Sequence, residues 1–225
     1  MKRKDPGATF RTSFERAALF VLILMTVGAV SIIVPLFLYQ SNYITYDQLN
    51  YYAETGLELS FLLSALIYVR FVVPKKSGTA EELGLGRKGA TLRNVALGFL
   101  VFAIILTLEF IVSLISQVTG VQINTNVSSV LQGAPLWLLF FSAVVFPVCE
   151  EVLFRGLMVP RLGIVSSALI FGAMHYSYDS TFGIEMIAAF VFAVIAGYVF
   201  RRTKSVYPSI VAHILVNTTT ALMTL

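Results

Sequence analysis

Seven long apolar stretches constrain this chain more than any other feature of its sequence. A helix needs about 17 to 25 residues to cross the roughly 30 Å hydrocarbon core of a bilayer, and each stretch reaches that length. We therefore predict an all-α fold, a polytopic transmembrane bundle of about seven helices. The stretches are Ala17–Tyr39, Leu57–Val73, Leu92–Val118, Leu136–Pro160, Leu162–Tyr178, Ile184–Phe200 and Tyr207–Leu225.

The composition indicates the same class of protein. Of the 225 residues, 57% are hydrophobic and 12% are charged, whereas soluble domains carry about 25% charged residues. No polar segment is long enough to fold as a separate soluble domain. We expect a single membrane domain over residues 1–225 in a multi-pass integral membrane protein, with a prokaryotic plasma membrane as the expected location.

The distribution of Lys and Arg predicts the orientation, because cytoplasmic loops of membrane proteins are enriched in these residues. With seven spans, every basic residue lies on, or close to, the side of the amino terminus. The opposite loops carry Asp47, Glu54, Glu58, Asp179 and Glu185 and no basic residue. The amino terminus is therefore predicted to be cytoplasmic. The basic residues are Lys2, Arg3, Lys4, Arg11, Arg16, Arg70, Lys75, Lys76, Arg87, Lys88, Arg93, Arg155, Arg161, Arg201, Arg202 and Lys204.

This arrangement also accounts for the net charge of +4, since basic residues beside a membrane favour anionic lipid head groups. The lipid bilayer is thus an expected partner, and nucleic acid is not. The single cysteine, Cys149, excludes an intramolecular disulfide and a metal site made of several cysteines.

Ionisable and amide side chains inside the spans are the candidates for function. A charged residue at the centre of a membrane helix costs about 2.5 to 3.5 kcal/mol even on lenient scales, so its presence requires a reason. We interpret Glu109 as structural, because no second ionisable group shares its helix face. The remaining candidates are Glu150, Glu151, Arg155, His175, His213 and Asn217.

Their spacing suggests how they interact. Glu151 and Arg155 are four residues apart, which favours an ion pair along one helix face. Glu150 points about 100° away and is available to a neighbouring helix. Counting about 1.5 Å per residue from the cytoplasmic end of each span places Glu150, His175 and Asn217 roughly 15 to 18 Å deep, and His213 at roughly 9 Å. We therefore expect these side chains to converge.

A carboxylate, imidazoles and an amide in a shielded site can hydrolyse an amide bond, with Glu150 as the general base that activates water. No Gly-x-Ser-x-Gly sequence supports serine chemistry. Two histidines and a glutamate can bind zinc, but no His-Glu-x-x-His spacing is present. We therefore favour a site without a metal or other cofactor.

Three short sequences on successive predicted helices carry a family resemblance: EEVLFR (150–155), FGAMH (171–175) and HILVN (213–217). Together they resemble the EExxxR, FxxxH and HxxxN motifs of the CPBP family, the CAAX-protease and bacteriocin-processing proteins that are also called the Abi family. The resemblance covers residues 134–220, which would form the catalytic core.

The resemblance implies an intramembrane endopeptidase similar to the type II CAAX prenyl protease. The resemblance assigns water activation to Glu150 and His175. It assigns an oxyanion hole to His213 with Asn217, and support of the site to Glu151 with Arg155. The family was long labelled metalloprotease, but a glutamate-dependent mechanism needs no metal, and we favour it. The expected substrate is a membrane-associated peptide or protein, of which prenylated CAAX proteins are one candidate.

Two other functions remain open from the sequence. The same pocket could bind a membrane peptide without cutting it, as in a scaffold or bacteriocin-immunity protein. Alternatively, Glu109, Glu150 and the histidines could form a proton pathway in a proton-coupled transporter.

Overall fold

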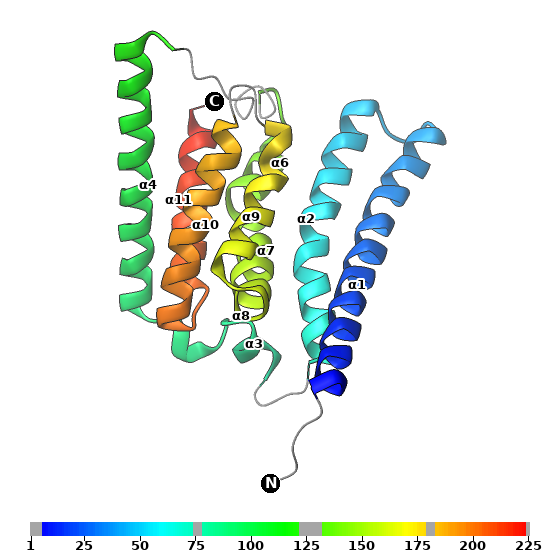
Figure 1. Ribbon diagram of the computed structural model, residues 1–225. Helices are drawn as coiled ribbons and strands as arrows, with labels where there is room; N and C mark the ends of the chain where they lie inside the picture. The colour runs from blue at the N-terminus through cyan, green and yellow to red at the C-terminus, as the bar shows by residue number, and fades with distance from the viewer. Residues whose placement is uncertain (1–5, 74–77, 122–131, 179–182, 224–225) are drawn as a thin grey trace. The chain divides into compact units, whose positions relative to one another are not determined.

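The computed structural model of the protein describes residues 6–73, 78–121, 132–178 and 183–223, and every regular element in these ranges is helical (Figure 1). The predicted all-α fold is therefore confirmed. Several residues used to predict the orientation lie outside the described residues. They are Lys2, Arg3, Lys4, Lys75, Lys76 and Asp179. The cytoplasmic amino terminus stays a prediction.

The chain forms two compact units, Met1–Thr79 and Ala80–Leu225. The first unit is a hairpin of two helices, α1 (Pro6–Gln40) and α2 (Tyr46–Phe71). Thr45 begins α2 with a capping box, in which its hydroxyl accepts a hydrogen bond from the backbone N–H of Gln48 and the Gln48 side chain accepts one from the Thr45 N–H. The expectation of a single membrane domain stays a prediction.

The second unit contains the remaining helices. Residues 136–162 form one continuous helical run that includes two π-helical segments, η2 and η3. The elements are α3 (Thr79–Glu82), η1 (Arg87–Gly89), α4 (Leu92–Thr119), α6 (Leu136–Phe140), η2 (Phe141–Val145), α7 (Phe146–Glu151), η3 (Val152–Met158), α8 (Val159–Leu162), α9 (Ile164–Met174), η4 (His175–Tyr178), α10 (Ile184–Thr203) and α11 (Tyr207–Leu222).

Five helices in the described ranges are long and apolar enough to cross a membrane, which makes this an integral membrane protein. Two of the seven predicted spans are shorter than expected: α9 has 11 residues and α11 has 16. Helix α9 begins after Gly163, whose φ of +87° is not helical, and at His175 the chain changes to a 3-10 turn. Hydropathy detects the apolar stretch but not these local changes of backbone.

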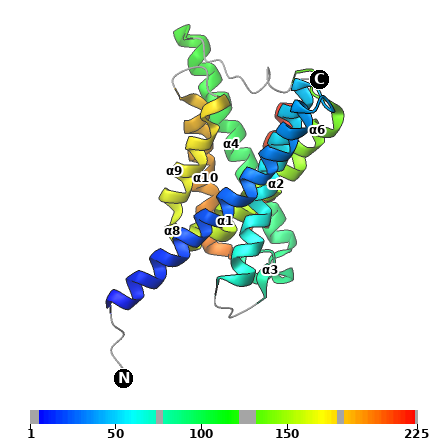
Figure 2. The same cartoon turned by 90° about the vertical axis from the view of Figure 1, so that its right-hand side faces the viewer.

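Close helix packing brings the predicted site residues into one region of the second unit. Helix α11 packs against α4, η2 and α7. Helix α9 packs against α10, and the two lie side by side in Figure 2. Glycines permit the closest contacts. A Cβ atom on Gly98 of α4 would lie 2.6 Å from the Cβ of Val211, and one on Gly172 of α9 would lie 2.8 Å from the carbonyl oxygen of Met186. Helix α11 lies directly beside α7, the segment that carries Glu150.

Residues 80–89 join the ends of several of these helices. Leu83 in this segment has no exposed surface. The Gly84 carbonyl accepts a hydrogen bond of 3.1 Å from the Val206 N–H, and the Leu85 carbonyl accepts one of 3.1 Å from the Tyr207 hydroxyl. The segment therefore fixes the start of α11, the helix that carries Ser209 and His213.

The contact between this segment and η3 gives a test of the packing. A Cβ atom on Gly156 would lie 2.5 Å from the Leu83 carbonyl oxygen, which is closer than real Cβ contacts. Gly156→Ala is therefore expected to destabilise the protein by about 1 to 3 kcal/mol, the usual effect of overpacking. Thermal unfolding of the purified protein in detergent measures the change.

Gly28→Ala is the matched control, because its added Cβ would meet only ordinary contacts, at 3.7 Å from Leu57 and 3.8 Å from Ser60. This control should be neutral or slightly stabilising, since alanine favours helix more than glycine. Equal effects of the two substitutions would contradict the described contact between Gly156 and Leu83.

Candidate functional site

Glu150 and Glu151 end a short α-helical segment, α7, that lies between two π-helical segments. Each π turn is wider than an α turn, and such turns occur frequently at functional sites. They also change which residues share a helix face. For residues on opposite sides of η2 or η3, the α-helical value of about 100° per residue therefore no longer predicts which side chains share a face.

Glu151 and Arg155 form the predicted ion pair. The Arg155 Nη1 lies 2.9 Å from the Glu151 Oε1, and both side chains are almost completely buried, with 1% and 0% of their surface exposed. The guanidinium carbon lies 4.4 Å from the ring centroid of Phe171 and 5.1 Å from that of Phe192. Within the described residues the guanidinium donates no well-aligned hydrogen bond. The adjacent carboxylate and the two aromatic faces therefore hold the buried cation.

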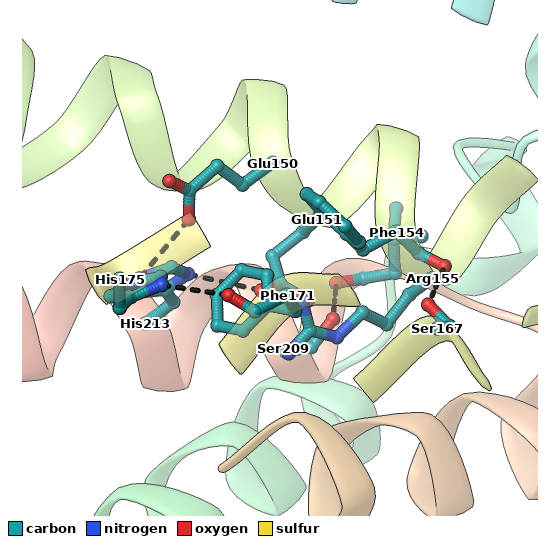
Figure 3. A network of polar contacts seen from close by, with 10 residues as sticks. Glu150, Glu151, Phe154, Arg155, Ser167, Phe171, His175, Ser209 and His213 are labelled. Carbon is teal, nitrogen blue, oxygen red and sulfur yellow. Dashed lines mark hydrogen bonds and ion pairs between the residues drawn. The ribbon is translucent and has the colours of Figure 1, made fainter. Parts of the chain in front are cut away.

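His213 lies between the two glutamates (Figure 3). Its Nδ1 is 3.0 Å from the Glu151 Oε1, and its Nε2 is 3.6 Å from the Glu150 Oε2. The first contact is a hydrogen bond, whereas the second is an ion-pair distance longer than a hydrogen bond. Glu151 thus contacts a second helix as well as Arg155. Spacing along one helix predicted the pair with Arg155, but it carries no signal for this contact with α11.

The two adjacent carboxylates differ in accessibility. Glu151 has no exposed surface, while 13% of the Glu150 side chain is exposed. Glu151 is also surrounded by Arg155, His213 and the hydroxyl of Ser209. Glu150 is therefore the carboxylate that a water molecule or a substrate can reach.

His175 faces the same carboxylate from η4. Its Nδ1 is 2.9 Å from the Phe171 carbonyl oxygen, a distance at which Nδ1–H donates to that oxygen. Nε2 is then the acceptor atom of the neutral ring. Glu150 is close enough for its charge to act on His175, and the ring centroids of His175 and Phe171 are 4.7 Å apart. The structure therefore brings Glu150, His175 and His213 together, as the sequence predicted.

Asn217 lies one helical turn from His213 and has a different partner. Its Nδ2 donates a 3.0 Å hydrogen bond to the Ser142 carbonyl oxygen in η2. The estimated depths, which placed His213 nearer the membrane surface than Glu150, are wrong, because His213 contacts Glu150 and Glu151 directly. The estimate assumed that every helix begins at the membrane surface. Val206, which lies just before α11, has no exposed surface, so α11 begins inside the protein.

Three further residues belong to the site and were not predicted as site residues. Ser209 is 2% exposed, lies four residues before His213 and lies close to Glu151 (Figure 3). Its hydroxyl donates a hydrogen bond of 3.0 Å to the Val206 carbonyl oxygen. Phe171 and Phe192 surround the Arg155 guanidinium. Ser209 could have been predicted from its spacing of four residues from His213, but no sequence pattern indicates Phe192.

Glu109 lies apart from these residues, in an exposed stretch of α4. Cys149 is a buried thiol with 1% of its surface exposed. Within the described ranges, no group of three or more His, Cys, Asp or Glu side chains has the geometry to hold a metal ion. The His213 nitrogens both face carboxylates, and the His175 Nδ1 faces a carbonyl.

One comparison identifies a family. Residues 132–219 match the family model of type II CAAX prenyl endopeptidase Rce1-like proteins. The match begins near the start of the predicted catalytic core and includes all three short sequences that carry the resemblance. Comparisons with curated proteins and with solved structures find no match.

The Glu151–Arg155 pair gives a stability prediction. Arg155→Met removes the cation and leaves the buried Glu151 carboxylate without its ion-pair partner, so we expect about 3 to 5 kcal/mol of destabilisation. Adding Glu151→Gln to Arg155→Met should recover part of this loss, because the unpaired charge is then removed. Thermal unfolding in detergent measures both effects.

Arg202→Met is the matched control. Arg202 also lies over a ring, 5.1 Å from the centroid of Tyr198, but it is exposed. Its replacement should change stability by no more than about 0.5 kcal/mol. If both substitutions had the same effect, the buried pair would not have the role assigned to it.

Proposed function

Because the chain belongs to the CPBP family of CAAX proteases through its Rce1-like domain at residues 132–219, we propose that it is an intramembrane endopeptidase. It would hydrolyse a peptide bond of a membrane-associated peptide or protein. The observation that carries the proposal is the position of Glu150, a partly exposed carboxylate facing two histidines inside an apolar helical unit. If Glu150 only formed a structural ion pair, one histidine would be enough, and His175 would not be needed beside it.

Glu150 is the general base in this mechanism. Its carboxylate takes a proton from a water molecule as the water oxygen attacks the peptide carbonyl. The Nε2 atom of His175 accepts a hydrogen bond from the same water and orients it, because Nδ1 is committed to the Phe171 carbonyl. The water is thus positioned by two acceptors on different helical elements.

The attacked carbonyl becomes an oxyanion, which needs hydrogen-bond donors. His213 supplies one from its Nε2, the ring atom that faces the open side of the site. The Asn217 amide has two N–H groups, and only one is used by the Ser142 carbonyl. The second is available to the oxyanion. Glu151 and Arg155 act indirectly, since they fix the ring of His213.

The substrate reaches this site from the membrane. The helices around the site expose apolar side chains, so the enzyme works within the lipid bilayer, and a peptide associated with the membrane is the matching substrate class. Prenylated CAAX proteins are one candidate because the family model is that of prenyl endopeptidases. Bacteriocin-like peptides are another, as the sequence resemblance implies.

Substitution of the proposed base is the central test. Glu150→Gln keeps the size of the side chain but removes the acceptor of the water proton, so cleavage of a membrane peptide by the purified enzyme should fall by about 10²- to 10⁴-fold. Thermal unfolding would verify that the variant is folded. Cleavage at an undiminished rate would reject the mechanism.

Glu109→Gln is the matched control, since Glu109 is also a carboxylate within a span but lies outside the site network. Proteolysis should be unchanged in this variant. A proton-coupled transporter that uses Glu109 would instead show pH-driven flux in liposomes that this substitution abolishes. A peptide-binding scaffold would retain its peptide binding in Glu150→Gln and show no cleavage in the native protein.

Metal dependence is tested separately. We expect the protein to cleave its substrate at full rate after extensive chelation, because the proposed mechanism uses only side chains and water. Bound zinc would be measured by elemental analysis on the same sample. Activity that is lost on chelation and restored by zinc would overturn the glutamate mechanism.

A further inference from the structure

We infer that His213 carries a proton on both ring nitrogens in the resting protein and that it protonates the leaving amine of the substrate. The inference rests on the proposed function but assigns His213 a second role, as the general acid. The role follows from the position of one imidazole ring between two carboxylates, with a different ring nitrogen facing each of them.

The hydrogen-bonding capacity of the groups determines one proton. An ionised carboxylate only accepts hydrogen bonds, so the 3.0 Å contact between Glu151 and the His213 Nδ1 requires a hydrogen on Nδ1. A neutral ring would then present the lone pair of Nε2 to the Glu150 oxygen, 3.6 Å away. Two acceptors would then face each other, because the Glu150 Oε2 atom is buried and has no hydrogen-bond partner within the described residues. A proton on Nε2 removes this conflict.

The charges of the cluster lead to the same state. Arg155 is positively charged, and Glu151 is paired with it. With Glu150 also ionised, the group has one negative charge in excess, and a buried charge without compensation is costly. A positively charged His213 neutralises the cluster. The ring centroid of Phe192 lies 4.9 Å from that of His213, within the range in which an aromatic ring stabilises a cation.

His175 does not compete for this role. It is the other titratable group that faces the cluster, and it comes from η4 rather than α11. Its Nδ1 contacts the uncharged Phe171 carbonyl rather than a carboxylate. The His175 ring also packs against Phe171, the same ring that covers the Arg155 guanidinium, and a second cation there would be repelled by Arg155. The two histidines therefore have different resting states, neutral for His175 and positively charged for His213.

With these two resting states, every proton that moves in the reaction is supplied and recovered by Glu150, His213 and the attacking water. As the water oxygen bonds to the carbonyl carbon, Glu150 takes one water proton and the carbonyl electron pair moves onto oxygen. His213 donates its Nε2 proton to the amide nitrogen while the C–N bond breaks and its electron pair goes to nitrogen. A carboxylic acid and an amine result. Glu150 then returns its proton to the His213 Nε2, which lies 3.6 Å from the Glu150 Oε2, and both groups are restored.

The Glu151–Arg155 pair keeps this cycle in place. The Nδ1 hydrogen bond to Glu151 is the same whether Nε2 carries a proton or not, so the ring does not turn between the two steps. The guanidinium of Arg155 holds the Glu151 carboxylate. Glu151 and Arg155 are therefore positioning residues for the acid, and they transfer no proton themselves.

Histidine nitrogen NMR of the full-length protein in lipid bilayers tests the resting state. The chain has two histidines, so ¹⁵N-labelled histidine gives a two-residue spectrum, and His175→Gln assigns the remaining signals to His213. At neutral pH we expect His213 to have two protonated nitrogens and His175 to be neutral with its proton on Nδ1. Glu150→Gln should convert His213 to a neutral ring, and Glu109→Gln should leave the spectrum unchanged. A neutral His213 in the unsubstituted protein would overturn the inference.

Kinetics test the acid role. A peptide amide needs protonation of its leaving nitrogen, whereas the nitrophenyl ester of the same acyl peptide does not. His213→Gln should therefore slow amide cleavage at least tenfold more than ester cleavage. His175→Gln is the comparison variant, and it should slow both substrates by a similar factor because both reactions need activated water.

The outcomes are distinguishable. Equal losses on amide and ester in His213→Gln would mean that His213 only stabilises the oxyanion, which rejects the acid role and keeps the protease. Absence of cleavage of any membrane peptide or ester by the unsubstituted protein would reject the proposed function instead. In that case the nitrogen spectrum still decides whether His213 is charged at rest.

Discussion

The buried ion pair between Glu151 and Arg155 is the interaction on which the rest of the site depends. It lies entirely within the protein, at 2.9 Å, and each additional contact of Glu151 is made possible by it. An isolated carboxylate at this position would be too costly to remain ionised, and an uncharged carboxyl would hold the Nδ1–H of His213 less strongly. The pair thus allows Glu151 to fix the position of His213 on α11. The aromatic rings of Phe171 and Phe192 are needed for the same reason, because they cover the cation that keeps Glu151 charged.

Polar residues within the membrane-spanning helices also explain the unusual backbone around them. Helix α11 contacts the 136–162 run at two levels: His213 meets α7, and Asn217 meets the Ser142 carbonyl in η2. A π-helical turn leaves carbonyl groups without their usual α-helical partners, and the Asn217 amide satisfies one of these groups. Asn217 therefore stabilises the irregular backbone that precedes Glu150 and Glu151. This role is compatible with its second N–H group serving the oxyanion.

Much of this arrangement could be predicted from the sequence, and the parts that could not have identifiable physical reasons. The all-helical membrane fold follows from apolar length, and the Glu151–Arg155 pair follows from a spacing of four residues. The convergence of Glu150, His175 and His213 was also expected, since few other polar groups occupy the spans. The depth of His213 was wrong, because the buried approach of residues 80–89 to Val206 displaces the start of α11. The contact between Glu151 and His213 depends on how two helices pack, and spacing along either one alone contains no information about it.

The centre of this polar site is a hydrocarbon ring. Phe171 is 1% exposed, and its ring contacts both the Arg155 guanidinium and the two imidazoles. Around this ring the charges of Glu151 and Arg155 are almost completely enclosed, whereas Glu150 is partly exposed. Of the two adjacent carboxylates, Glu150 is therefore the one that offers water a surface. A side chain without a polar atom thus lies at the point where the enclosed charges meet the histidines.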